Sequence, residues 1–334
     1  MGFKNQGTCS KIRYQNHIAN FNTFSRIIKH KKKKKEVEFK KSKMEDCENM
    51  AIKAVQQIML GSVTKNEKQT RATLRAIKEA GYDGIELNGF MIRPTSFMVR
   101  MMTKMAGMPV GKGGDYDWKR MLDEAGLSVV SVHEDLGTIQ REPEHVIEEA
   151  KKFGTDKVVI TGMYRFDYSD KEAVLKLAKD LNEAGARLKE GGIRLLYHNH
   201  NCEFRKVEAG KTAFDLLIEE TNPEYVNFEL DSYWATEAGV SAIALMKQLG
   251  DRLKLYHIND RGTRIEGPSM TPIIKSDSME LGYGNMNLEE LVKQALSVNV
   301  DAIILESHKN WVEKSPIKSL QVSAEFLNRE IKRF

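Results

Sequence analysis

The sequence predicts a TIM-type (β/α)8 barrel, and three observations carry this prediction. From residue 51 onward the spacing between apolar residues switches repeatedly between two and about 3.6 residues. Eight short apolar runs therefore alternate with amphipathic segments. Each run is nearly continuous, which is typical of parallel strands buried on both faces. Eight strand–helix units over roughly 280 residues suit this barrel. No GxGxxG follows the first run to indicate the main rival, a doubly wound open sheet.

The individual elements follow from the same two periods. We expect strands at 56–63, 84–87, 127–136, 156–164, from 193, and at 225–234, 252–260 and 301–309. Helices are expected at 66–81, 115–126, 143–154, 169–192, 211–220, 240–250, 288–299 and 316–334. The glycine- and methionine-rich stretch 88–114 predicts a long loop with a helical piece around 97–105.

The charge distribution separates the first fifty residues from the rest. Residues 1–50 carry 13 Lys and Arg against 5 Asp and Glu, whereas residues 51–334 carry 39 against 42, a net charge of −3. The run "KHKKKKKE" is typical of a solvated, disordered tail. We therefore expect residues 1–50 to be a basic, disordered extension and residues 51–334 to be the catalytic barrel. Three scattered cysteines and no long apolar run indicate a reducing, cytoplasmic location and no membrane span.

The stretch "IRLLYHNHNCEF" shows where chemistry is expected. An apolar run ends in His198 and His200, which share one strand face because successive side chains alternate. His133, His257 and His308 also follow apolar runs, whereas His145 lies in a predicted helix. Active sites of such barrels lie at the C-terminal ends of the strands. The histidines therefore point to a site at that end.

The last four strands each end in a group that can bind a metal. These groups are His198 or His200, then Asp231, His257 and Glu306. Since neighbouring strands lie about 4.8 Å apart, such side chains can meet around one cation. Imidazoles mixed with carboxylates suit Mn²⁺, Mg²⁺, Co²⁺ or Zn²⁺. Asp231 alone could instead cap the next helix, but a buried Glu306 needs a cation or several donors. His308 is the weakest member of the group.

Six motifs resemble the sugar phosphate isomerase/epimerase family, the xylose-isomerase-like TIM barrels. They are "GYDGIEL", "LYHNHNCEF", "NFELDSYW", "LYHINDRG", "ELGYGNMNLEEL" and "IILESH", in order from about Val55 to the C-terminus. The resemblance implies one divalent metal, usually Mn²⁺, with Asp231, His257 and Glu306 as ligands. Ketose 3-epimerases of the family have a glutamate at the position that appears as His198 here, and "HNH" is closer to the inosose dehydratase-like and 3-keto-sugar branch.

The resemblance implies proton abstraction from the carbon next to a carbonyl, through an enediolate. His198 or His200 is expected to be the fourth ligand or the base, with Glu306 sharing acid–base work and Glu203 completing the metal shell if His198 does not. His133 would act as the opposing acid or base, or bind a sugar hydroxyl. Arg261, Trp234 and Tyr164 are expected to contact substrate. Epimerisation, isomerisation and elimination remain open, and the histidine in place of glutamate favours elimination or an unusual epimerisation.

Other functions compete with this hypothesis. A partner-dependent subunit that cleaves 3-keto-glycosides by elimination fits the same branch, as does a non-catalytic barrel that only binds. An endonuclease-IV-like nuclease would need more metal ligands and a basic face, which the net charge of the barrel does not favour. We expect a small-molecule sugar substrate, a homo-oligomer or a second subunit, no membrane, and no nucleic acid.

Overall fold

The computed structural model describes residues 51–94, 101, 116–264, 267–307 and 309–333. The expected basic extension, the helical piece around 97–105 except Met101, and His308 lie outside these residues. Residues Ala51–Phe334 form a compact unit. Of the helices in the described part, none combines the length and apolar character that crossing a membrane requires.

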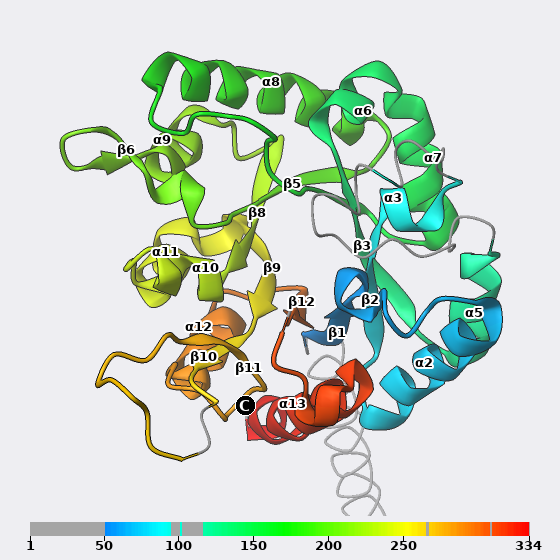
Figure 1. Cartoon of the computed structure of the whole chain (residues 1–334). Helices are drawn as coiled ribbons and strands as arrows, with labels where there is room; N and C mark the ends of the chain where they lie inside the picture. The colour runs from blue at the N-terminus through cyan, green and yellow to red at the C-terminus, as the bar shows by residue number, and fades with distance from the viewer. Residues whose placement is uncertain (1–50, 95–100, 102–115, 265–266, 308, 334) are drawn as a thin grey trace, which may run out of the picture. The chain divides into compact units, whose positions relative to one another are not determined.

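A closed barrel of eight parallel strands confirms the predicted fold class (Figure 1). The strands are β1 (Ile52–Gln56), β2 (Gly84–Asn88), β3 (Ser128–Glu134), β4 (Lys157–Ile160), β5 (Arg194–His198), β8 (Val226–Asp231), β9 (Leu253–Ile258) and β12 (Ala302–Leu305). Their order around the barrel is β1-β12-β9-β8-β5-β4-β3-β2, so each strand pairs with its neighbours along the chain and β12 closes onto β1.

Helices surround the strands on the outside (Figure 1). The longer ones are α2 (Glu67–Ala80), α5 (Trp118–Ala125), α7 (Pro143–Phe153), α8 (Lys171–Glu190), α9 (Ala213–Glu220), α11 (Ala242–Leu249), α12 (Leu288–Ser297) and α13 (Pro316–Glu330). Short helices follow several strands: α3 (Gly89–Ile92), α6 (Leu136–Arg141) and α10 (Ser232–Glu237). Two hairpins lie outside the barrel: β6 (Lys206–Glu208) with β7 (Lys211–Thr212), and β10 (Asp260–Gly262) with β11 (Asp277–Met279). Single 3₁₀ turns are η1 (Gln57–Leu60), η3 (Cys202–Phe204), η4 (Gly250–Arg252), η5 (Val312–Lys314) and η6 (Ile331–Arg333).

Local signals place the helix ends where the sequence predicts them. Asn66 caps α2 by accepting a hydrogen bond from the Gln69 amide, and Gly81 ends it with φ of 100° in the left-handed region. Thr212 and Asp215 form a reciprocal capping box at the start of α9. These caps satisfy backbone groups that the helices themselves leave unpaired.

The barrel interior changes from apolar to polar along its axis. A small apolar cluster lies inside the strands: Ala54, Val130, Val159, Leu196, Leu255, Ala302 and Ile304. Further along the same strands come His198, His257 and Glu306, each two residues after an apolar member of this cluster. Because side chains alternate along a strand, this spacing keeps all of them on the inner face. The apolar layer thus forms the floor beneath the polar groups.

The first strand lies elsewhere than predicted. It spans Ile52–Gln56, and most of the predicted range 56–63 is the turn η1 and the loop after it. Lys53 interrupted the apolar pattern, but its ammonium donates to Asn328 Oδ1 at 2.6 Å and lies 4.0 Å from Asp83 Oδ2. A lysine can bury its stem along such a strand while its charged end is paired. Similarly, Ser232–Trp234 at the end of the predicted strand 225–234 begin helix α10.

Candidate metal and substrate site

A cavity of about 980 Å³ opens among the loops that follow the strands. Residues from β1, β2, β3 and β5 line it, together with the loop after β4 and the segment after β12. Of the residues that the sequence singled out, seven line this cavity, six of them being His133, Tyr164, His198, His200, Glu203 and Glu306. Trp234 is the seventh, so predicted histidines, carboxylates and aromatic residues share one space.

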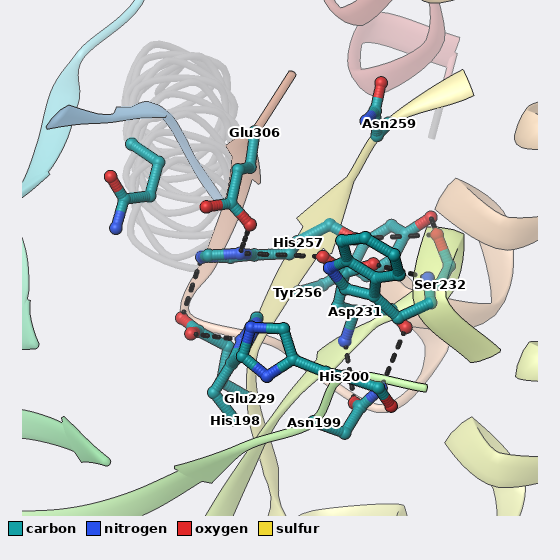
Figure 2. A network of polar contacts seen from close by, with 12 residues as sticks. His198, Asn199, His200, Glu229, Asp231, Ser232, Tyr256, His257, Asn259 and Glu306 are labelled. Atoms are coloured by element: carbon teal, nitrogen blue, oxygen red, sulfur yellow. Dashed lines mark hydrogen bonds and ion pairs between the residues drawn. The ribbon is translucent and has the colours of Figure 1, made fainter. Parts of the chain in front are cut away.

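The four predicted metal ligands converge. His198, Asp231, His257 and Glu306 are all buried, and each offers a ligand atom within 4.8 Å of the others. His257 Nδ1 lies 2.9 Å from Glu306 Oε2 and 4.0 Å from Asp231 Oδ2. Figure 2 shows the His257 ring between Glu306 on one edge and Glu229 on the other. The ends of β5, β8, β9 and β12 therefore supply one mixed imidazole and carboxylate cluster, which we call the upper cluster.

Asp231 is fixed in place from two sides. Its Oδ1 accepts a hydrogen bond from the Trp234 amide at 3.0 Å, which caps α10. The Asn199 side chain pairs with the Asp231 backbone, accepting from its N–H at 2.9 Å and donating to its carbonyl at 3.1 Å. Burial raises the pKa of Asp231 to about 6, against the effect of His198, and the Glu306 carboxylate adds to the increase. A divalent cation would relieve that repulsion between carboxylates.

A second group of buried residues lies next to the upper cluster. Glu86, His133 and Glu229, together with His257, offer ligand atoms within 4.8 Å of one another. We call Glu86, His133, Glu229 and His257 the lower cluster. Burial alone would lower the pKa of His133, but the carboxylates of Glu86 and Glu229 raise it to about 10. Likewise, burial would raise the pKa of Glu229, but His257 and His133 hold it well below its ordinary value.

The loop after β5 is held by Glu203. This buried carboxylate accepts hydrogen bonds from the His200 amide at 2.8 Å and the Tyr197 hydroxyl at 3.1 Å. Tyr197 in turn contacts the Tyr168 hydroxyl at 2.6 Å. Glu203 is thus used within the protein to position the loop, although it also lines the cavity. The His200 ring lies 4.8 Å from that of His198 and 5.9 Å from that of Trp234, so it faces the same space.

The predicted substrate contacts lie in different places. Tyr164 is 76% exposed at the cavity wall, and Trp234 is partly buried there. Arg261 does not line this cavity; it pairs with Glu237 and lines a separate hollow of about 370 Å³. Tyr233, Trp311, Asp277 and Lys309 line the main cavity although the sequence did not single them out. Lys309 is paired with Asp277 at 3.3 Å.

The donor set fits a divalent cation. Two imidazoles and two carboxylates in the upper cluster match the ligands that Mn²⁺, Co²⁺ and Zn²⁺ accept. The adjacent cavity leaves room on one side for substrate oxygens. We infer that these residues can hold a metal.

Neither Glu86 nor Glu229 was predicted from the sequence as a site residue. Both lie on strands and both are fully buried. The available signal was a carboxylate within the short apolar runs "GIEL" and "NFEL". A buried carboxylate requires partners, but nothing in the sequence showed that His133 and His257 are those partners.

Comparison with known proteins assigns the family. The model of the "Xylose isomerase-like TIM barrel" family matches residues 74–330, and this chain belongs to that family. An inosose dehydratase from Mesomycoplasma hyopneumoniae is 29% identical over 120 residues, which are 36% of this chain and 35% of that protein. An inosose dehydratase from Clostridium perfringens is 32% identical over 84 residues, 25% of this chain and 27% of that protein. The chain thus spans about a third of the curated relatives it matches.

Solved structures share the fold at lower identity. A sugar phosphate isomerase/epimerase from Parabacteroides distasonis has a TM-score of 0.65 at 22% identity, covering 84% of this chain and 93% of that chain. The IolI protein, solved with a bound zinc atom, has a TM-score of 0.60 at 15% identity, covering 85% of this chain and 99% of that chain. At these identities the similarity supports the barrel alone.

Proposed function

We propose that this protein is a divalent-metal-dependent lyase that removes a proton next to the carbonyl of a keto-sugar and eliminates a β-substituent. The observation that carries this proposal is the convergence of His198, Asp231, His257 and Glu306 beside the cavity. The relatives named inosose dehydratase support elimination over isomerisation or epimerisation. Mn²⁺ is the expected metal, with Mg²⁺, Co²⁺ or Zn²⁺ as alternatives.

The upper cluster would hold the metal, and a bound metal would supply Lewis-acid polarisation of the substrate carbonyl. The carboxylates of Asp231 and Glu306 balance its charge, and the rings of His198 and His257 complete the protein ligands. Glu306 is thereby committed to ligation rather than to proton transfer in this proposal.

His200 is our candidate for the base. It lines the cavity beside His198, and Glu203 fixes its backbone. An imidazole titrates near neutral pH, which suits a general base. It would take the proton from carbon, and the electron pair of that C–H bond would form a C=C bond as the β-substituent leaves.

His133 is our candidate for the acid. Its Nδ1 is buried and has no hydrogen-bond partner among the described residues, and the residue lines the same cavity. Its Nε2 faces the carboxylates of Glu86 and Glu229. In this role the Nδ1–H of His133 would donate its proton to the leaving oxygen, so that a hydroxyl departs as water.

The cavity volume favours a second candidate within the same chemistry. About 980 Å³ is at the upper end of the range for small-molecule sites, which is ample for a sugar that carries an aglycone. A 3-keto-glycoside would then lose its aglycone in place of water. Comparing cyclic keto-polyols with keto-glycosides as substrates separates the two candidates.

Proton exchange in D₂O tests the proposal. With Mn²⁺ bound, we expect the protein to exchange the carbon-bound proton next to the carbonyl of a keto-polyol or keto-glycoside, and to form an unsaturated product. His200→Gln should reduce the rate by about 10²-fold or more, whereas His145→Gln, on an exposed site of α7, should match wild type. If metal-loaded protein exchanges no carbon-bound proton with either class, the proposal is wrong.

A further inference from the structure

The lower cluster lies inside the barrel and comes from four different strands. Glu86 is on β2, His133 on β3, Glu229 on β8 and His257 on β9. Glu86 and Glu229 are fully buried, and His133 and His257 are 3% and 1% exposed. The ion pairs of Glu86 and Glu229 among the described residues run only to histidines. No lysine or arginine in that part of the chain therefore balances these carboxylates.

The facing atoms form a closed ring whose spacing suits a metal. His133 Nε2 lies 3.1 Å from Glu86 Oε2 and 3.0 Å from Glu229 Oε2. His257 Nε2 lies 2.6 Å from Glu86 Oε2 and 3.2 Å from Glu229 Oε1. Two ligands of an ion, each about 2.1 Å from it, are about 3.0 Å apart at a right angle and about 3.4 Å apart at the tetrahedral angle. The four separations lie near the first value, so the side chains would move apart by a few tenths of an ångström around a tetrahedral ion.

Hydrogen bonds alone explain this ring poorly. A ring nitrogen carries one proton, which points along one direction. Yet His133 Nε2 faces two carboxylate oxygens at nearly equal distances. Glu229 Oε1 faces His257 Nε2 at 3.2 Å without making a hydrogen bond. A metal ion bound by both histidines and both carboxylates would explain this arrangement. Each ring nitrogen would direct its lone pair at the ion, and a carboxylate oxygen bound to the same ion would lie on either side of the nitrogen.

The charges of the buried carboxylates support the same conclusion. This step depends on the proposed function, because it assumes that the upper cluster holds a metal. An imidazole that ligates a metal through one nitrogen is neutral. Once His198 and His257 bind the upper ion, their rings carry no positive charge beside Glu86 and Glu229. A second divalent ion would place positive charge next to these two buried carboxylates.

We propose that the lower cluster binds a second divalent cation, with His257 bridging the two ions as an imidazolate that has released its remaining N–H proton to solvent. Its Nδ1 faces Glu306 and Asp231 of the upper cluster, and its Nε2 faces Glu86 and Glu229. Four protein ligands in a buried position resemble a closed structural site, which favours Zn²⁺ or Co²⁺. The lower ion would hold strands together and orient His257, while the upper ion meets the substrate.

Metal stoichiometry of the full-length protein tests this proposal. Wild type, stripped and reloaded with Zn²⁺ or Co²⁺ and then desalted, should hold two ions per chain. Glu86→Gln should hold one, Asp231→Asn should hold one, and the double variant none. Glu280→Gln removes another buried carboxylate, one that pairs with Arg264 and Ser319, and should keep two.

Anomalous diffraction of zinc-loaded wild-type crystals gives an answer that needs no variant. Two peaks, one within about 2.3 Å of His257 Nε2, support the proposal. A single ion per chain, or a second ion that Glu86→Gln retains, overturns it. If wild type binds one ion and still catalyses proton exchange, the proposed lower site is wrong and the proposed function stands. If wild type binds two ions but catalyses no exchange, the lower site stands and the proposed function is wrong.

Discussion

Asp231 shows how one residue can serve two partners. One oxygen caps α10 through the Trp234 amide, and the other lies 4.0 Å from His257 Nδ1. From the sequence, capping and metal binding were alternatives for this aspartate. The structure shows that they are compatible, because the cap fixes the rotamer that directs the second oxygen into the upper cluster.

Two substitutions of Asp231 separate these roles. Asparagine is a good N-cap but lacks the charge, whereas alanine has neither property. We expect both variants to lose the upper ion, and Asp231→Ala to be less stable than Asp231→Asn by about 1 kcal/mol. Metal analysis and urea denaturation of the stripped proteins measure the two effects. Equal stability of the two variants would contradict the capping role.

Glu134, which follows the proposed ligand His133 but is not itself a proposed ligand, gives a pH-dependent prediction. Burial raises the pKa of Glu134 from 4.5 to about 7, although Arg93, 2.6 Å away, opposes the shift. Between these values the folded protein keeps a proton that the unfolded chain has lost. The contribution of Glu134 to the free energy of unfolding therefore falls as pH rises through this window.

Glu134→Gln removes this titration. We expect the stability of wild type relative to Glu134→Gln to fall between about pH 5 and pH 8. Chemical denaturation at several pH values measures the difference. A difference that stays constant or increases over this range would show that the carboxylate is already ionised in the folded state at low pH.

At the scale of single elements, sequence patterns located strands with continuous apolar runs and helices with clear caps. They failed where a tertiary contact replaced a local signal. Lys53 is satisfied by Asn328, which lies 275 residues further along the chain, so the first strand could not be recognised from its own pattern. The hairpin β10–β11 brings Asp277 and Ser278 to the cavity, and its short strands carry no periodic signal.

Helix α8 contains a glycine for a reason that only packing reveals. A Cβ on Gly185 would lie 2.4 Å from the Tyr225 carbonyl oxygen, just before β8. We expect Gly185→Ala to lower the free energy of unfolding by about 1–3 kcal/mol, despite the better helix propensity of alanine. Lys179→Ala, on the same helix, is the control and should change stability by less than about 0.5 kcal/mol. Denaturant titration would contradict this account if Gly185→Ala were as stable as wild type.

At the scale of the whole molecule, the barrel and the upper cluster could be predicted from the sequence because both depend on a regular repeat. The C-terminal ends of parallel strands lie at the same end of the barrel, so the polar residues at these strand ends indicate where the site is. The lower cluster could not be predicted, because it pairs Glu86 with His257 across the barrel interior, 171 residues apart. The expected homo-oligomer or second subunit stays a prediction, which light scattering during size-exclusion chromatography would test.

The upper ion should stabilise the whole barrel, since its ligands come from four neighbouring strands. A ligand at about 100 times its dissociation constant adds about 2.7 kcal/mol to the free energy of unfolding. We therefore expect chelation to lower the melting temperature and Mn²⁺ to restore it. The Asp231→Asn variant, which should keep only the lower ion, should respond less than wild type to both treatments in calorimetry. Equal responses of the variant and wild type would place the stabilising metal elsewhere.

The central claim is that four strand ends bind one divalent ion at the barrel mouth. Anomalous diffraction from a crystal soaked in Mn²⁺ tests it most directly. We predict a manganese peak at about 2.1–2.3 Å from ligand atoms of His198, Asp231, His257 and Glu306. No peak at saturating Mn²⁺, or one that these four side chains do not touch, would contradict the claim.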